Sequence, residues 1–152
     1  MNHQTRYTIR LFSLLGSLCL LLATANLQAK QHLAISLKGT SEMPPVITKA
    51  SGKGKIIVFP NRMVSGSIHS YDLYATRAYI HEAAIGENGP RIMTLNKIAN
   101  GTFVVPDEAR LTKAQYRSYM AGKLYVNVRS VQYPLGEIRA QLPRFRSTAR
   151  LR

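Results

Sequence analysis

The chain has 152 residues, a formal net charge of +14 from 21 Lys plus Arg against 7 Asp plus Glu, and a single cysteine. This length suits one domain of ordinary size, which can build a core without disulfides or metal clips. A strong positive charge attracts anionic surfaces. The basic residues are scattered from Lys30 to Arg152 and form no arm or stripe, so no specific nucleic-acid site is expected.

Residues 1–29 have the pattern of a secretory signal peptide: a basic start, an apolar run at 11–22 and small residues before a cleavage point. The apolar run is well short of the roughly 20 residues that span a bilayer, which argues against an uncleaved anchor. We expect cleavage after Ala29, with Ala25 as the alternative. Export to the periplasm or the cell exterior would follow, with no transmembrane segment in the remaining chain.

Cleavage would change the composition of the protein. Arg6 and Arg10 would be removed, which leaves 19 Lys plus Arg against 7 acids and a net charge of +12. Cys19 would be removed as well, which excludes disulfides, cysteine metal sites and cysteine nucleophiles together. The residues that follow divide into a domain at 30–142 and a basic tail at 143–152.

Short runs of alternating apolar and polar residues, separated by turn residues, make up most of the domain and are typical of a β-sandwich or barrel. In chain order, strands are predicted at residues 32–37, 55–59, 63–73, 77–83, 91–95 and 102–105, with a loop at 39–54. One segment breaks this pattern. Thr112 and Gln115 form the capping box of a short helix, and Gly122 ends it.

Two further strands surround the turn at 133–136 and predict a hairpin across residues 125–142. Side chains alternate between the two faces of a strand, so Val126 and Val128 would face the core. The opposite face would carry a crowded polar surface, made of Tyr125, Asn127, Arg129, Glu137, Arg139 and Gln141. Glu137 and Arg139 share that face, where they could form a salt bridge or together hold an anionic ligand.

No catalytic motif occurs in the sequence. His81-Glu-Ala-Ala-Ile85 lacks the second histidine of the zinc-protease motif, and no nucleophile elbow or phosphate-binding loop is present. A metal site would need three or four converging donors. His32, His69 and His81 are the imidazoles of the domain, and His69 and His81 converge only if their strands are neighbours.

Four segments resemble the CHRD domain, a repeat first described in chordin that also occurs singly in secreted bacterial proteins. They lie at 37–45, 78–90, 111–128 and 133–142, beginning with Leu37-Lys-Gly-Thr-Ser-Glu-Met-Pro-Pro45 and ending with Tyr133-Pro-Leu-Gly-Glu-Ile-Arg-Ala-Gln-Leu142. The resemblance covers nearly all of residues 33–142. It implies an immunoglobulin-like β-sandwich, similar in shape to the copper/zinc superoxide dismutase barrel. It also implies an extracytoplasmic location and no established enzymatic activity.

The chain departs from the family at its imidazoles. CHRD domains typically show His-Xaa-His where this chain has Tyr79-Ile80-His81, and Asn-Val-His where it has Asn127-Val128-Arg129. Two of three family imidazoles are therefore replaced, one of them by a cation that would repel a metal ion. Ala140 likewise replaces a glycine of the family pattern.

These observations predict an all-β fold, an immunoglobulin-like or superoxide-dismutase-like Greek-key β-sandwich with one short helix. The predicted function is an exported, non-catalytic binding or structural domain without a cofactor, whose partner is an unknown protein or an anionic envelope component. The alternative is a copper- or zinc-binding, dismutase-like metalloprotein that uses His69 and His81. The candidate binding face comprises Tyr79, His81, Tyr125, Asn127, Arg129, Glu137 and Arg139.

Overall fold

A computed structural model describes residues 34–144. The predicted signal peptide at 1–29, the histidine at position 32 and most of the basic tail at 143–152 lie outside the described residues. Across residues 34–144, no helix has the length and apolar character needed to cross a membrane.

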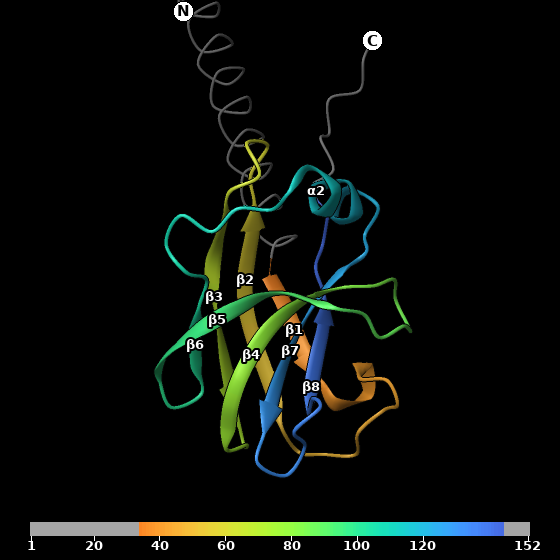
Figure 1. Cartoon of the computed structure of the whole chain (residues 1–152). Helices are drawn as coiled ribbons and strands as arrows, with labels where there is room; N and C mark the ends of the chain where they lie inside the picture. The colour runs from red at the N-terminus through yellow and green to blue at the C-terminus, as the bar shows by residue number, and fades with distance from the viewer. Residues whose placement is uncertain (1–33, 145–152) are drawn as a thin grey trace, which may run out of the picture. The chain divides into compact units, whose positions relative to one another are not determined.

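Eight strands, a short 3-10 turn and one α-helix make up the described part of the chain (Figure 1). In chain order they are β1 (Ala34–Lys38), η1 (Gly39–Ser41), β2 (Ser51–Val58), β3 (Val64–Tyr71), β4 (Ala75–Glu82), β5 (Arg91–Ala99), β6 (Thr102–Val104), α2 (Lys113–Met120), β7 (Leu124–Ser130) and β8 (Ile138–Gln141). The prediction of an all-β chain with one short helix is confirmed.

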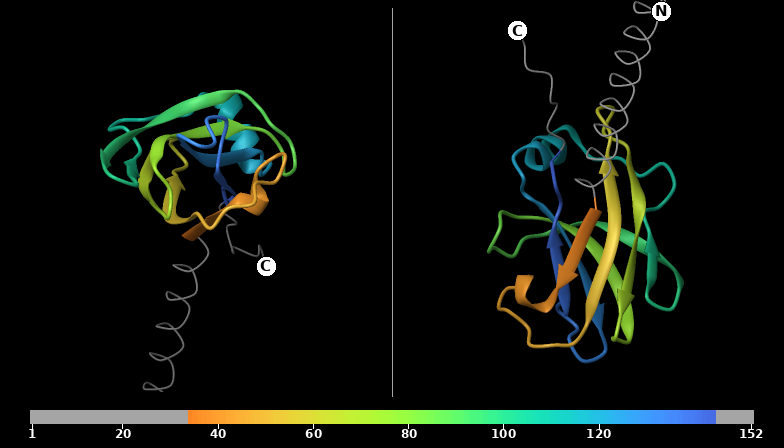
Figure 2. Two further views of the ribbon diagram at one scale, coloured as in Figure 1. Left: turned by 90° about the horizontal axis from the view of Figure 1, so that it is seen from below. Right: turned by 180° about the vertical axis from the view of Figure 1, so that it is seen from behind.

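The strands pair antiparallel and close into a barrel in the order β1-β2-β3-β6-β5-β4-β7-β8 (Figure 2). β1 closes the barrel, because it pairs along its whole length with β2 and, at Lys38, with Arg139 of β8. Full closure leaves no free sheet edge. The architecture is therefore a closed barrel, where the family resemblance implied a sandwich of two sheets.

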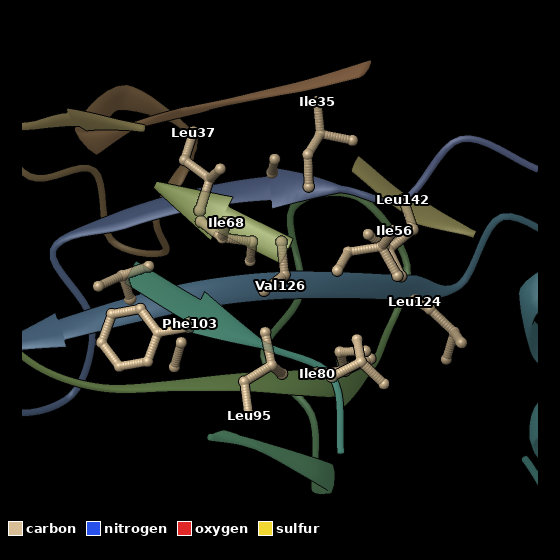
Figure 3. Close-up of a cluster of buried hydrophobic side chains, with 14 of the residues drawn as sticks. Ile35, Leu37, Ile56, Ile68, Ile80, Leu95, Phe103, Leu124, Val126 and Leu142 are labelled. Carbon is tan, nitrogen blue, oxygen red and sulfur yellow. The ribbon is translucent and has the colours of Figure 1, made fainter. Parts of the chain in front are cut away.

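Aliphatic side chains from the strands fill the interior of the barrel (Figure 3). Leu37 of β1, Ile68 of β3 and Phe103 of β6 belong to this cluster and have no exposed surface. Val126 and Val128 of β7 are also fully buried in it, as their alternation with polar residues predicted. Burial of this apolar surface is the main favourable term in folding.

Two strands extend four residues beyond their predicted bounds, whereas the others differ by one or two residues at their ends. β2 begins at Ser51, inside the predicted loop, and β5 continues to Ala99. Gly52 and Gly54 carry no side chain to alternate, so the sequence pattern does not show the start of β2. The structure explains the second glycine, because a Cβ at Gly54 would lie 2.4 Å from the carbonyl oxygen of Ser67 on β3.

The local predictions for the helix are confirmed. Thr112 Oγ1 accepts a hydrogen bond from the Gln115 amide at 3.1 Å, and Gln115 Oε1 accepts one from the Thr112 amide at 2.9 Å. Gly122 follows the helix with a φ of 75°, a conformation that favours glycine. The hairpin is confirmed as well, with Asn127 paired to Arg139 across β7 and β8.

Phe103→Ala is expected to lower the free energy of unfolding by about 3–5 kcal/mol, because it leaves a cavity at a fully buried position. Urea unfolding of the variant and the parent chain measures this difference. Phe59→Ala is the matched control, because Phe59 is 41% exposed and its truncation opens no cavity. Equal losses for the two variants would contradict the assignment of Phe103 to the core.

Candidate functional site

The seven residues of the predicted binding face lie on the outside of the barrel, on and beside β4, β7 and β8. Because Val126 and Val128 point into the core, the residues that alternate with them on β7, Tyr125, Asn127 and Arg129, point outward. The register places Asn127 opposite Tyr79 on β4 and opposite Arg139 on β8. We call this group the polar layer: Tyr79, His81, Tyr125, Asn127, Arg129, Glu137 and Arg139.

The polar layer is largely buried, whereas the sequence predicted an exposed polar surface. Arg139 is only 2% exposed, and Arg129 alone in the layer is not classed as fully buried. Two loops cover the layer: residues 42–47, between β1 and β2, and residues 83–90, between β4 and β5. They lie on the same side of the barrel (Figures 1 and 2).

Arg139 connects β8 to both covering loops. Its guanidinium donates to the Glu87 carbonyl oxygen at 2.8 Å and to Asn88 Oδ1 at 3.2 Å. Asn88 in turn donates through Nδ2 to the Met43 carbonyl oxygen at 2.6 Å. One backbone carbonyl and one side-chain amide oxygen thus accept from the guanidinium, in place of a carboxylate.

Aromatic rings and guanidinium groups stack through the layer. The guanidinium carbon of Arg139 lies 3.4 Å from the ring centroid of Tyr125, which stacks on His81 at 4.9 Å and 9°. His81 meets the ring of Tyr79 edge-on at 5.9 Å, and Arg129 lies 4.7 Å from the same Tyr79 ring. Cation–π contacts of this kind favour the charged arginines in a partly dry setting.

The salt bridge considered between Glu137 and Arg139 does not form in the described chain. Glu137 Oε1 accepts a hydrogen bond from Thr48 Oγ1 at 2.6 Å. Arg139 instead contacts the Tyr125 ring and the 83–90 loop. Each side chain therefore has a different partner: Glu137, which precedes β8, pairs with Thr48, and Arg139 with the 83–90 loop.

Glu42, which sequence reasoning did not select, reaches the layer from the first covering loop. It is 5% exposed. Burial raises the pKa of its carboxyl to about 7, although Arg139, Arg129 and a hydrogen bond from Asn127 act in the opposite direction. The sequence could have indicated Glu42 as a site residue, because it is one of only seven acids and precedes Met-Pro-Pro in a segment that resembles the family.

The geometry around His81 fixes its tautomer when the ring is neutral. Its Nδ1 lies 3.0 Å from the Gly89 carbonyl oxygen, which can only accept, so Nδ1 carries the proton. Nε2 is then an acceptor. Burial lowers the pKa of His81 below its ordinary value of 6.5, and the charges of Arg129 and Arg139 act in the same direction, whereas hydrogen bonds to Gly89 and Asn127 favour the charged ring.

Four buried polar atoms in this region lack a hydrogen-bond partner: Glu42 Oε1, His81 Nε2, Asn127 Oδ1 and Arg129 Nε. Native proteins contain few such atoms, and each one has a cost. Gly136 keeps the space between two of these residues open. A Cβ at its φ of 152° would lie 2.6 Å from both Asn127 Nδ2 and Glu42 Oε1.

The same four residues line a groove of about 810 Å³. Its other walls are the first covering loop and the segment 132–136, and its rim includes Ile47 and Leu135, which are 98% and 83% exposed. A mostly apolar wall with a few polar groups and a shifted pKa is typical of a ligand site.

The structure does not bring together the histidines that the metal alternative requires. His69 lies on β3, which pairs with β2 and β6, while His81 lies on β4, which pairs with β5 and β7. Among residues 34–144, no group of three or more His, Cys, Asp or Glu side chains could hold a metal ion. The copper- or zinc-binding alternative has no site in the part of the chain that is described.

Glu42→Gln is expected to remove a pH dependence of stability. Because the pKa of about 7 in the folded state exceeds the ordinary 4.5, the unfolded chain releases this proton first. The free energy of unfolding therefore falls between about pH 4.5 and 7, by up to about 3 kcal/mol, and the loss is complete above that range. Urea unfolding from pH 4 to 8.5 measures this fall as the difference between the parent and the variant.

Glu108→Gln is the control for Glu42→Gln, because Glu108 is an exposed glutamate. Its stability curve should keep the shape of the parent curve. A decline that persists in Glu42→Gln would show that Glu42 is not the responsible group.

Arg139→Lys is expected to lower the free energy of unfolding by about 2–4 kcal/mol, since an ammonium group cannot reproduce both hydrogen bonds and the ring contact. Amide hydrogen exchange should become faster in residues 83–90, which lose this anchor. Arg117→Lys, on the exposed face of α2, serves as the control. Unchanged exchange in the loop would contradict the anchoring role.

Comparisons with known proteins place the chain in a family. The model of the CHRD domain matches residues 33–142. No curated protein and no solved structure matches the chain. With the match spanning most of its length, the chain belongs to the CHRD domain family.

Proposed function

We propose that this chain is an exported, non-catalytic binding domain that recognises an anionic or protein partner at the groove beside the polar layer. Export rests on the signal-peptide pattern at residues 1–29, and places the domain in the periplasm or outside the cell. The binding role is inferred from the groove and from the residues that line it.

The observation that carries this proposal is the set of unpaired polar atoms beneath the groove. Glu42, His81, Asn127 and Arg129 each keep one buried atom without a partner. The core of a folded domain normally avoids such atoms. Their concentration beneath one groove supports a role other than packing for this part of the fold.

The charge of the groove supports an anionic partner. Arg129 and Arg139 lie close enough to act on both Glu42 and His81. Burial disfavours the phenolate of Tyr79, yet hydrogen bonds from Arg77 and Arg91 and the charge of Arg129 outweigh it and lower the pKa. The outer face of β4 and β7 therefore has a positive potential, which attracts anions.

Binding is favoured over catalysis by the position of the proton-carrying groups. The unpaired atoms of Glu42 and His81 have almost no accessible surface. A general acid or base must reach a proton of its substrate. A partner in the groove would instead meet the apolar rim and the part of Arg129 that remains accessible.

Titration of the isotope-labelled protein with size-fractionated envelope extract tests this function. Amide shift changes in NMR spectra should cluster on residues 42–47 and 132–136. The Arg129→Gln variant should need at least ten times more extract to give the same shift changes. Arg117→Gln, which removes an arginine outside the groove, should leave them unchanged. Shift changes that cluster elsewhere, or that survive Arg129→Gln, would refute the proposed site.

A further inference from the structure

The groove has a chemically divided lining. Exposed apolar side chains stand on its rim: Ile47 at 98%, Leu135 at 83% and Met43 at 39% exposure. A single exposed apolar residue is ordinary, but several around one hollow mark a contact surface. Four residues of the polar layer form the polar part of the lining: His81, Tyr125, Asn127 and Arg129. An occupant that matches both parts must be amphipathic.

The polar part of the lining offers one free donor. Arg129 Nε is buried without a partner, so it is not itself the contact. Among residues 34–144 the other guanidinium nitrogens of Arg129 make no hydrogen bond, and the side chain keeps some accessible surface. The other arginine of the site, Arg139, is already committed to Glu87, Asn88 and the Tyr125 ring. One available guanidinium fits the planar, singly charged head of a carboxylate.

Beneath the groove, acceptors outnumber donors. Glu42 Oε1, the lone pair of His81 Nε2 and Asn127 Oδ1 are three unpaired acceptor atoms when Glu42 is ionised. A proton on Glu42 converts one of its oxygens into a donor and thereby reduces the excess of acceptors. The proton needs no open path wide enough for a ligand, so burial of these atoms does not prevent it.

We infer that the groove takes a single long-chain carboxylate, with its head at Arg129 and its chain along Met43, Ile47 and Leu135, and that binding brings a proton to Glu42. This inference rests on the proposed binding function. It assigns a ligand class to the same groove and adds a coupling that the binding function alone does not require.

The coupling follows from the charges around Glu42. His81 faces the site from β4, Tyr125 and Arg129 from β7, and Arg139 from β8. Arg129 normally favours the ionised form of Glu42. A carboxylate seated on Arg129 cancels that effect and adds its own negative charge, so Glu42 holds its proton more strongly. By linkage, ligand affinity then falls as the pH rises through 7.

Other groups do not supply this pH dependence. The pKa of His81 is lowered below 6.5, so its titration lies beneath a window from pH 6.5 to 8.5. Arginine remains charged throughout, and a simple carboxylate ligand is already ionised. Glu42 is the carboxyl of the lining whose pKa of about 7 lies inside this window.

Calorimetric titration of the naturally processed protein with hexanoate, octanoate, decanoate and dodecanoate, below their micelle concentrations, tests the inference. Affinity should rise about threefold to fourfold per methylene while the chain lies against the rim. Dodecanol and dodecyltrimethylammonium, which share the chain and lack the anionic head, should bind at least tenfold more weakly than dodecanoate.

Variants then locate the site. Arg129→Gln should reduce dodecanoate affinity at least tenfold, and Ile47→Ser should flatten the dependence on chain length. Arg117→Gln and Ile98→Ser are matched controls, because Ile98 is 64% exposed on β5 and neither residue lines the groove. Losses of equal size in the controls would overturn the placement.

The proton is measured by repeating the titration at pH 7.5 in two buffers of different ionisation enthalpy. The parent should take up a sizeable fraction of one proton per ligand, and its affinity should fall severalfold between pH 6.5 and 8.5. Glu42→Gln, which keeps a neutral side chain in place, should bind with no proton uptake and no pH dependence. Equal uptake in parent and variant would overturn the coupling.

The outcomes separate this inference from the binding function on which it rests. If no carboxylate binds, but envelope extract still shifts the groove residues in an Arg129-dependent way, the ligand class is wrong and the binding function stands. If vesicles of anionic phospholipid bind while monomeric dodecanoate does not, the occupant is a membrane surface and the inference fails. If neither extract nor carboxylate contacts the groove, both proposals fail.

Discussion

A buried guanidinium that forms no salt bridge within residues 34–144 organises the outer face of this barrel. Arg139 is 2% exposed, so each of its donors must find an acceptor within the protein. The Glu87 carbonyl and the Asn88 side chain accept two of these hydrogen bonds, and the Tyr125 ring covers the flat face of the group. Because these acceptors belong to the 83–90 loop, burying the charge requires that loop to fold over β8. The Asn88 contact to Met43 extends the same constraint to the 42–47 loop.

That constraint also determines the electrostatics of the groove. The 42–47 loop carries Glu42 under cover, where burial raises the pKa of its carboxyl to about 7 despite two nearby arginines. The 83–90 loop presents the Gly89 carbonyl to His81 and thereby fixes which nitrogen holds the proton. Polar groups with shifted pKa values are thus assembled outside a barrel whose interior is aliphatic. The barrel supplies rigidity, and the loops supply the dry environment.

The sequence predicted the features that depend on neighbouring residues. Alternation predicted the hairpin and its buried aliphatic face, and the spacing of Thr112 and Gln115 predicted the capping box. It could not predict what covers the polar face, because loops 42–47 and 83–90 reach it through contacts more than 40 residues apart in the chain. Glu42 was missed for that reason. The salt bridge considered between Glu137 and Arg139 failed because the covering segments compete for both side chains.

Two of the departures of this chain from the CHRD pattern, at positions 79 and 129, lie close together in the fold. Positions 79 and 129, where the family typically shows histidine, lie on adjacent strands and face the same side of the barrel. Here they hold Tyr79 and Arg129, whose ring and guanidinium lie 4.7 Å apart. Two imidazoles have thus been exchanged for one cation–π pair, which holds a fixed positive charge beside His81 and lowers its pKa further. A metal ion would be repelled from such a position, while an oxyanion would be attracted to it. The residues at these two positions therefore disfavour a metal ion and suit the anion recognition proposed above.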